Sequence, residues 1–507
     1  MMNHRVKKSM LAVLTAAALF PMAQAEHVTF IAVNDTHSQI EPASDGTGGL
    51  LRRRAIYDQL RRENPNTITV HAGDAVQGTV FFSLYRGEVE YSAMDSLGYD
   101  IIILGNHEFD NGINDIAHYY KNIKATKLSA NYDLSGTPLE GLFQPYVIKA
   151  YGDKRVGIFG INVQPKGLIV DKNCAGMRYL PAEEVAEATA KYLKEVQHVD
   201  YAVMVSHIGY DSYNPGEPND TSIVAASRNI DFVIGGHSHT VLKPGTKYCE
   251  IKNADGRTII VGQNGKSGKI VAAYDLDLET GEVTYRHIPV DASWDEAASR
   301  YTAMNQWLDH YRAGVDSLMN NPVGQSVREM SNKGAALQNW VSDATMNIIE
   351  EISGVKGVDL AIMNKGGIRT DMPKGVVTEG LINSMFPFDN RFVVLEMTGQ
   401  QLLDALKVMA SRGGDAVSKE LRVTYNDKGE ITQAKVKGKK VNPKRNYKVA
   451  TIDYLANGGD YMVPMTEAKR LFVDEVKYGD HMLNYVRSLE KAGKKIDSPD
   501  EERMVKK

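Results

Sequence analysis

The chain contains very little cysteine, and this scarcity excludes several kinds of protein. Among 507 residues only Cys174 and Cys249 occur, so neither a disulfide framework nor a cysteine-ligated zinc site can hold the fold together. A single bridge between the two cysteines and a pair of free thiols both remain open. The chain also lacks a G-x-S-x-G motif and an activated cysteine, which leaves no support for a serine or cysteine nucleophile.

Long hydrophobic runs are equally scarce. The first eight residues include three basic ones, residues 10–20 are apolar, and an Ala-Gln-Ala motif ends at Ala25. This pattern is typical of a secretory signal peptide cleaved before Glu26. No later segment is long and apolar enough to cross a bilayer. We therefore expect an exported protein, periplasmic or secreted, without an integral membrane segment.

The net charge is small and negative, −4 at pH 7. A mildly acidic chain does not favour binding to nucleic acid, so an anionic ligand must meet a local basic pocket. The lysine-rich stretch Lys435–Lys448 alternates with apolar residues and is better explained as protection of a sheet edge. Residues 50–62 predict a helix whose basic face is solvated, and we expect the polar tail after Lys491 to fray.

Five apolar, strand-like runs in the first half each end in a polar residue able to bind a metal. Polar side chains at the carboxyl ends of strands in an open α/β sheet converge on one site. Each pair alone has an ordinary turn or surface interpretation, but five at equivalent positions favour a common site. The candidate ligands are Asp35, His37, Asp74, Asn106, His207, His237 and His239.

The types and number of these residues indicate the metal chemistry. Histidine, aspartate and asparagine without cysteine suit borderline to hard divalent ions such as Zn, Mn, Co, Fe or Mg. Seven ligands exceed one tetrahedral zinc site and fit two ions that share a carboxylate. His107 follows Asn106 directly, and Asp110 lies three residues later, close enough to orient the ring.

The order D-x-H, G-D, G-N-H-E, H and G-H-x-H resembles the calcineurin-like metallophosphoesterases. By this resemblance Asp35, His37 and His239 hold one metal, Asp74 bridges, and the second metal is held by Asn106, His207 and His237. The resemblance makes His107 and Asp110 a catalytic pair in which a protonated His107 neutralises charge on the phosphate. It implies a four-layer α/β sandwich.

Three motifs in the second half extend the resemblance to the secreted 5′-nucleotidase family, which includes bacterial UDP-sugar hydrolases and 2′,3′-cyclic-nucleotide phosphodiesterases. They are Asn364 to Arg369, Phe386 to Asn390 and Asp453 to Asp460. A core or turn explanation competes for the aromatics and glycines taken singly. The resemblance implies that Phe388 and Tyr454 stack on the base and that Arg369 binds phosphate. It also implies that base or ribose is bound by Asn364, Asn390 and Asp460. Tyr454 stands where the family more often has phenylalanine. Lys333 stands where the family often has arginine, and a lysine cannot make the same bidentate contact.

This organisation predicts four segments: a signal peptide at 1–25, a dimetal phosphoesterase domain at 26–293, a linker at 294–322 and an α/β substrate-binding domain at 323–507. Residues Trp294–Asn321 have the apolar spacing of one long helix. The expected function is a dimetal phosphohydrolase acting on nucleoside 5′-monophosphates, with nucleotide sugars and cyclic nucleotides as further candidates. The alternatives are a thiosulfohydrolase of the same fold, which needs no base clamp, and a non-catalytic nucleotide-binding surface protein. The oligomeric state stays open.

Overall fold

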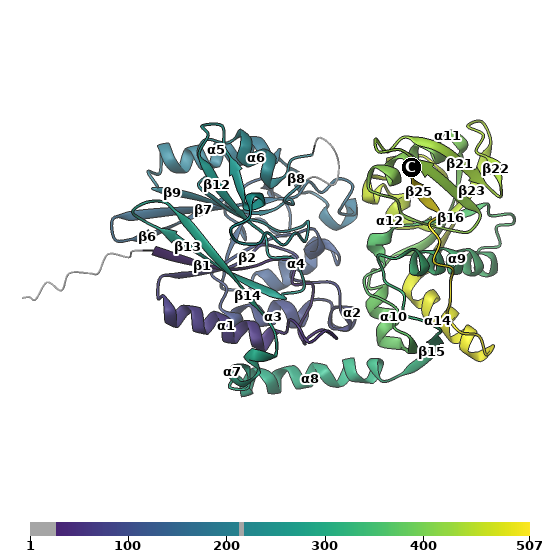
Figure 1. Cartoon of the computed structure of the whole chain (residues 1–507), viewed down its shortest axis with the longest axis horizontal. Coiled ribbons are helices and arrows are strands. Elements are labelled where there is room, and N and C mark those ends of the chain that lie inside the picture. The colour runs from purple at the N-terminus through teal and green to yellow at the C-terminus, as the bar shows by residue number, and fades with distance from the viewer. Residues whose placement is uncertain (1–26, 212–216) are drawn as a thin grey trace, which may run out of the picture.

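The computed structural model describes residues 27–211 and 217–507. The expected signal peptide and its cleavage point therefore lie outside the described residues. Within the described ranges, none of the helices combines the length and the apolar character needed to cross a bilayer. Two α/β domains follow one another along the chain and are joined by a helix that runs beneath them (Figure 1).

The first domain contains two six-stranded sheets packed face to face. One sheet has the order β14-β13-β1-β2-β3-β4 and the other has the order β11-β12-β10-β9-β7-β6. Buried residues such as Phe30 and Phe232 fill the space between the sheets, with ring centroids 5.9 Å apart. The strands are β1 (His27–Val33), β2 (Thr67–His71), β3 (Ile101–Ile103), β4 (Thr126–Leu128), β6 (Tyr146–Tyr151), β7 (Lys154–Asn162), β9 (Tyr201–His207), β10 (Phe232–Ile234), β11 (Glu250–Lys252), β12 (Thr258–Gly262), β13 (Ile270–Asp277) and β14 (Val283–Pro289).

Helices cover the outer face of each sheet, which makes four layers. Apolar residues of α1, α3 and α4 join the cluster on the outer side of the first sheet, and α5 belongs to the cluster on the second. The predicted four-layer sandwich is confirmed. The helices are α1 (Leu50–Glu63), α2 (Val80–Tyr85), α3 (Glu88–Leu97), α4 (Ile113–Tyr120), α5 (Ala182–Glu195) and α6 (Asp220–Ala226), and the short strands β5 (Tyr132–Asp133) and β8 (Arg178–Tyr179) pair with each other.

The strands that carry the candidate ligands are parallel where they adjoin. β1 pairs in parallel with β2, β2 with β3, and β9 with β10. Their carboxyl ends therefore lie at one edge of the sandwich, as the predicted site requires.

The connector is not the single long helix predicted for Trp294–Asn321. It consists of α7 (Asp295–Ala298) and α8 (Thr302–Met319), with a break between them. At the break Tyr301 has ψ 54°, outside the helical region, and its hydroxyl donates to Asp58 in the first domain. The apolar spacing does not reveal this break because it is set by a tertiary contact.

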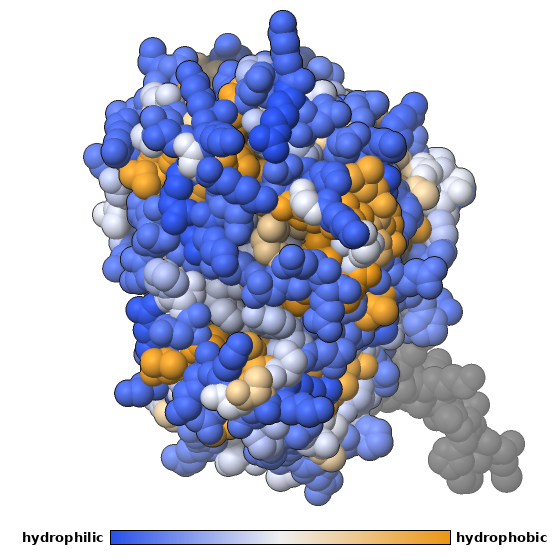
Figure 2. Space-filling model, turned by 90° about the vertical axis from the view of Figure 1, so that its right-hand side faces the viewer, coloured by the Kyte–Doolittle hydropathy of each residue, from blue (hydrophilic) through white to orange (hydrophobic). Residues whose placement is uncertain are grey.

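The second domain has one core, built around the five-stranded sheet β19-β16-β23-β18-β24. A four-stranded sheet, β22-β21-β20-β25, lies beside it. The surface of the second domain that is turned away from the first domain is mainly hydrophilic, with separate apolar patches (Figure 2). Its elements are β15 (Pro322–Ser326), α9 (Ala335–Ile352), β16 (Leu360–Met363), β17 (Gly375–Thr378), α10 (Glu379–Met385), β18 (Arg391–Thr398), α11 (Gly399–Ser411), β19 (Ala416–Val417), β20 (Leu421–Tyr425), β21 (Ile431–Val436), β22 (Lys439–Lys440), β23 (Asn446–Ile452), α12 (Asp453–Ala456), α13 (Val463–Thr466), β24 (Lys469–Lys477), α14 (Tyr478–Lys491) and β25 (Met504–Lys506).

Two surface expectations are wrong. The basic face of α1 is not fully solvated: Arg52 and Arg53 are buried, and Arg52 Nε lies 2.6 Å from Asp295 of α7. The tail after Lys491 does not fray: Arg503 is buried and binds Asp343 of α9 through two nitrogens. In both cases an arginine is buried because a carboxylate from a distant segment neutralises it.

The sheet-edge prediction for Lys435–Lys448 holds for only part of that stretch, and the cysteines do not form a bridge. Lys439 and Lys440 form β22 at the edge of its sheet, whereas the end of the stretch enters β23, a central strand of the other sheet. Cys174 and Cys249 are both free thiols. Cys249 is buried and receives a hydrogen bond from the Tyr285 hydroxyl.

Candidate active site

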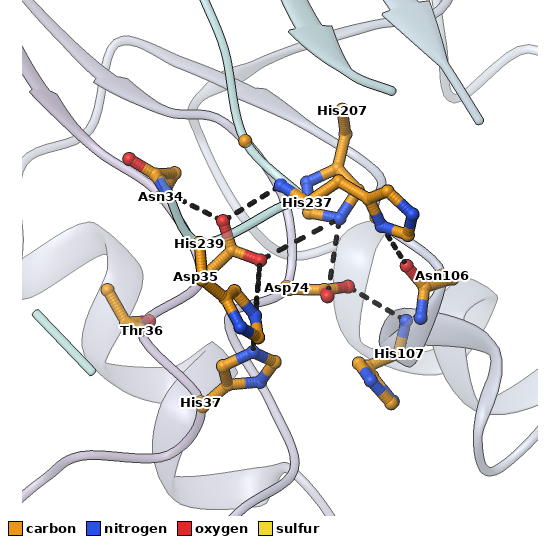
Figure 3. Close-up of polar contacts among 12 residues, drawn as sticks. Asn34, Asp35, Thr36, His37, Asp74, Asn106, His107, His207, His237 and His239 are labelled. Atoms are coloured by element: carbon orange, nitrogen blue, oxygen red, sulfur yellow. Dashed lines mark hydrogen bonds and ion pairs between the residues drawn. The ribbon is translucent and has the colours of Figure 1, made fainter. Parts of the chain in front are cut away.

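The loop after β1 and the loop after β10 bring together one group of three candidate ligands, Asp35, His37 and His239. The Nε2 atoms of His37 and His239 are 3.0 Å apart. Asp35 Oδ1 lies 3.8 Å from His37 Nε2 and 3.3 Å from His239 Nε2. The three donor atoms thus surround a single point (Figure 3).

A second group lies beside the first and consists of Asp74, His207 and His237. His207 Nε2 is 3.2 Å from Asp74 Oδ2, and the other ring nitrogen of His207 lies 2.7 Å from the Ala72 carbonyl. Asn106 Oδ1 is 2.9 Å from His237 Nδ1. These seven residues are the seven that the sequence analysis selected, and the structure brings all of them together.

The donor set fits cations. Asp35 Oδ1 and His207 Nε2 are buried without a hydrogen-bond partner, and they lie only 4.0 Å apart. A buried polar atom left unpaired costs about 1–3 kcal/mol, so each of these two atoms, one in either group, favours a cation as its partner. Oxygen and imidazole donors in this arrangement suit divalent first-row metals and Mg²⁺.

The backbone is strained where it carries these donors. Left-handed conformations cost non-glycine residues of order 1–3 kcal/mol each, and they cluster at functional sites. Five of the seven candidate ligands adopt this conformation, with φ from 45° to 81°: Asp35, His37, Asp74, His237 and His239.

The histidines of the two groups do not share one pKa shift: the Asp74 and Asp35 carboxylates outweigh burial and raise the pKa of His207 to about 10, whereas His37 and His237 shift downward. Burial, followed by the charge of His239, lowers the pKa of His37 well below its usual value. Burial, followed by His207, lowers the pKa of His237 to about 3. The lowered pKa values of His37 and His237 favour the neutral rings that metal ligation requires, and an ion bound at His207 would displace a proton there.

His107 faces the cavity and has a pKa shift opposite to that of His37 and His237. Its Nδ1 is 2.9 Å from Asp110 Oδ2, and its backbone N–H donates to Asp74 Oδ1 at 2.8 Å. Burial alone would lower the pKa of His107, but the Asp110 and Asp74 carboxylates outweigh it and raise the pKa. His107 is thus placed to carry a proton beside the two donor groups without belonging to either.

One cavity of about 1070 Å³ extends from the donor groups into the second domain. From the first domain, the candidate ligands Asp74, Asn106, His237 and His239 line it together with His107 and Asp110. The domains touch beside it: Tyr461 donates to Glu217 at 2.7 Å, and Arg86 lies 3.3 Å from Asp389. All seven predicted substrate residues line the same cavity, namely Lys333, Asn364, Arg369, Phe388, Asn390, Tyr454 and Asp460.

Phe388 brings the two halves of the site into contact. Its ring is 5.9 Å from that of His107, nearly parallel at 28°, and the Arg369 guanidinium lies 5.8 Å above it. Tyr454 is half-buried, and its hydroxyl donates to Asp460 at 2.9 Å. Neither aromatic ring is a fully buried core residue.

Lys266 and Arg412 are two of the cavity residues that the sequence prediction did not include. Lys266 follows β12, which runs parallel to β10, so the strand-end argument that found the ligands extends to it. Burial, followed by the charges of Arg369 and Lys333, lowers the pKa of Lys266 to about 8. Arg412 follows the end of α11, and nothing in its local sequence distinguishes it from a surface residue.

Family models match both domains. Residues 28–241 match the calcineurin-like phosphoesterase model, and residues 315–468 match the model of the 5′-nucleotidase C-terminal domain. The chain belongs to the 5′-nucleotidase family. The metallophosphoesterase fold of this family implies divalent metal ions, and the two donor groups described above are candidates to hold them.

Relatives of this 5′-nucleotidase family member cover most of its length. It is 27% identical to human 5′-nucleotidase over 88% of this chain and 85% of that protein. It is 26% identical to the trifunctional nucleotide phosphoesterase YfkN of Bacillus subtilis over 94% of this chain, but spans only 35% of that longer protein. The 5′-nucleotidase precursor of Thermus thermophilus superposes with a TM-score of 0.82 at 26% identity, covering 95% of this chain and 99% of that one.

Proposed function

We propose that this protein is an exported dimetal phosphohydrolase that removes phosphate from nucleoside 5′-monophosphates. The observation that carries the proposal is the shared cavity: metal-ligand candidates from one domain and an aromatic, amide and guanidinium set from the other line the same space. A nucleotide has a phosphate for the first set and a base with a sugar for the second.

The first domain holds the metals and the reacting phosphate. Asp35, His37 and His239 would hold one ion and Asn106, His207 and His237 the other, with Asp74 as the carboxylate shared between them. The ions are Zn, Mn, Co or Mg, and when bound they supply Lewis-acid charge and an activated water. The orientation of the Asp74 carboxylate is fixed by two neighbours. The backbone N–H of His107 donates to one carboxylate oxygen, and His207 faces the other.

His107 and Asp110 handle the proton of the leaving group. The Asp110 and Asp74 carboxylates outweigh burial and raise the pKa of His107, which favours the protonated ring. The hydrogen bond between Asp110 and Nδ1 leaves Nε2 to face the substrate. His107 then donates to the departing 5′-oxygen as a general acid.

The second domain binds the nucleoside and the non-bridging phosphate oxygens. Phe388 and Tyr454 stack on the base, where each stacked face contributes about 1–3 kcal/mol. Arg369 reaches the phosphate from its position over Phe388, and its guanidinium fork suits a phosphate oxygen pair. Lys333 adds a point charge in the same cavity. Asn364, Asn390 and Asp460 bind base and sugar.

The proposal is tested with a substrate panel on protein reconstituted with each metal in turn. Released phosphate is measured for AMP, other 5′-monophosphates, a nucleotide sugar, a 2′,3′-cyclic nucleotide and p-nitrophenyl phosphate. We expect the 5′-monophosphates to have the highest kcat/KM. Absence of phosphate release from every 5′-monophosphate, with two ions bound per chain, would refute it.

A further inference from the structure

The wall of the cavity beside Tyr454 is a connected network of charged and polar groups. The Tyr454 hydroxyl donates to Asp460 Oδ1 at 2.9 Å and accepts from the Asp460 backbone N–H at 3.2 Å. On the other carboxylate oxygen, Asn364 Nδ2 donates to Oδ2 at 2.9 Å, and Arg412 Nη1 lies 3.3 Å away. Asp460 is therefore held from both sides.

Arg412 is itself fixed in place. Its Nη2 lies 2.5 Å from Asp415 Oδ2, and the backbone N–H of Lys365 donates to the other oxygen of Asp415 at 3.0 Å. The side chains of Arg412 and Asp415 are 12% and 4% exposed. A guanidinium this enclosed, with carboxylates on two of its nitrogens, has one orientation, and it aims Nη1 at Asp460.

The ring of Tyr454 is equally constrained. A side chain at Gly459 would come within 2.5 Å of the ring atoms, so the Gly459 backbone covers one ring face directly. Only the opposite face is left for a ligand. Asp460 has the left-handed backbone value φ 51°, a strained conformation that places its carboxylate back toward the Tyr454 hydroxyl.

We propose that Arg412 is a positioning residue of the nucleotide site, which, with the Tyr454 hydroxyl, presents Asp460 to the sugar with a single free acceptor. An ionised carboxylate has about four acceptor positions. Tyr454 and Asn364 donate to two of them, and the Arg412 guanidinium, paired with Oδ2 at 3.3 Å, covers a third. The remaining position accepts a hydrogen bond from one sugar hydroxyl. Asp460 therefore requires a hydroxyl on the sugar but does not bind both hydroxyls of ribose.

This inference rests on the proposed function and predicts a specificity pattern. Because Asp460 accepts from one hydroxyl only, AMP and 2′-deoxy-AMP or 3′-deoxy-AMP are used with similar kcat/KM. The 2′,3′-dideoxy analogue has no donor for Asp460, and we expect its kcat/KM to fall about tenfold, equal to about 1.4 kcal/mol. The base-free substrate p-nitrophenyl phosphate is indifferent to the network.

Two variants test the network. Tyr454→Phe keeps the stacking ring and removes only the hydroxyl bond. The double variant Arg412→Gln/Asp415→Asn removes both charges of the buried pair, so that neither is left unpaired. For each we expect KM for AMP to rise about tenfold, a larger change than in kcat or in the turnover of p-nitrophenyl phosphate. Arg412→Lys should restore part of the affinity, because a point charge can still reach Asp460.

A binding measurement on metal-free protein provides a readout that does not depend on catalysis. Calorimetric titration with adenosine should show the same tenfold weakening in both variants. The matched control is Arg422→Gln, an exposed arginine that pairs with Glu501 in the same domain but outside the cavity. It should bind adenosine as the wild type does.

Failure of this inference is distinguishable from failure of the proposed function. If the wild type cleaves AMP but Tyr454→Phe and the double variant bind adenosine normally, the positioning role is wrong and the function stands. If 2′-deoxy-AMP and 3′-deoxy-AMP each lose as much as the dideoxy analogue, Asp460 takes two hydroxyls and the single-acceptor argument is wrong. A wild type that cleaves no nucleotide removes the basis of both.

Discussion

Replacing His107 with Ala separates proton donation from metal binding at one position. The side chain pairs with Asp110, whereas the contact with Asp74 is made by the backbone N–H, which alanine retains. The variant therefore keeps the hydrogen bond that helps to position the bridging carboxylate. Both metals should stay bound, and only the proton donor should be lost.

The size of the effect follows from the proton that the leaving group needs. A positioned general acid contributes on the order of 10²- to 10⁴-fold to the rate, which corresponds to about 2.7–5.4 kcal/mol of transition-state stabilisation. The 5′-alkoxide of a nucleoside is a poor leaving group and requires this proton. p-Nitrophenolate leaves readily without it. The loss in kcat should therefore be large for AMP and small for p-nitrophenyl phosphate.

The assay measures kcat on both substrates and the metal content of the same samples. His118→Ala is the matched control, because His118 is exposed on α4 and lies outside the cavity. If metal is lost in proportion to activity, His107 is a ligand. An equal loss for AMP and p-nitrophenyl phosphate would refute its role as the acid.

Three further results are expected. Asp110→Asn removes the charge that raises the pKa of His107. The ring then loses its proton at lower pH, so the alkaline limb of the plot of kcat against pH for AMP should move to lower pH. An unchanged limb would contradict the pairing of His107 with Asp110. Asp74→Ala should abolish turnover and reduce metal content, because the bridge holds both ions; full activity with two metals bound would show that Asp74 is not the bridge. Phe388→Ala combined with Tyr454→Ala should lower kcat/KM for AMP by the equivalent of roughly 2–6 kcal/mol, which is the stacking energy of two base faces. An equal fall in kcat/KM for p-nitrophenyl phosphate would mean that the two aromatic rings only support the fold.

The local sequence determined the first-domain site in unusual detail. Each candidate ligand follows an apolar run that forms a strand, and parallel strands place their carboxyl ends at one edge. The proximity of Asp35 and Asp74 could therefore be predicted from sequence, although the domain contains two sheets and several helices. Lys266 also follows such a strand, because β12 is parallel to β10.

Tertiary structure alone decided the features that depend on distant partners. The buried arginines Arg52 and Arg503 look like surface residues in sequence, because their carboxylate partners Asp295 and Asp343 are 243 and 160 positions away. The break before α8 has the same cause.

The cavity wall formed by Tyr454, Asp460 and Arg412 shows the contrast between local sequence and tertiary structure. Tyr454 and Asp460 are six positions apart in one motif, so their proximity is a local matter. Arg412 joins them only because the end of α11 packs beside that loop, and its spacing in sequence carries no sign of this. Periodicity and strand ends report which residues face a core or an edge. The orientation of a buried charge depends on the counter-charges that the completed fold places around it, and those are known only from the tertiary structure.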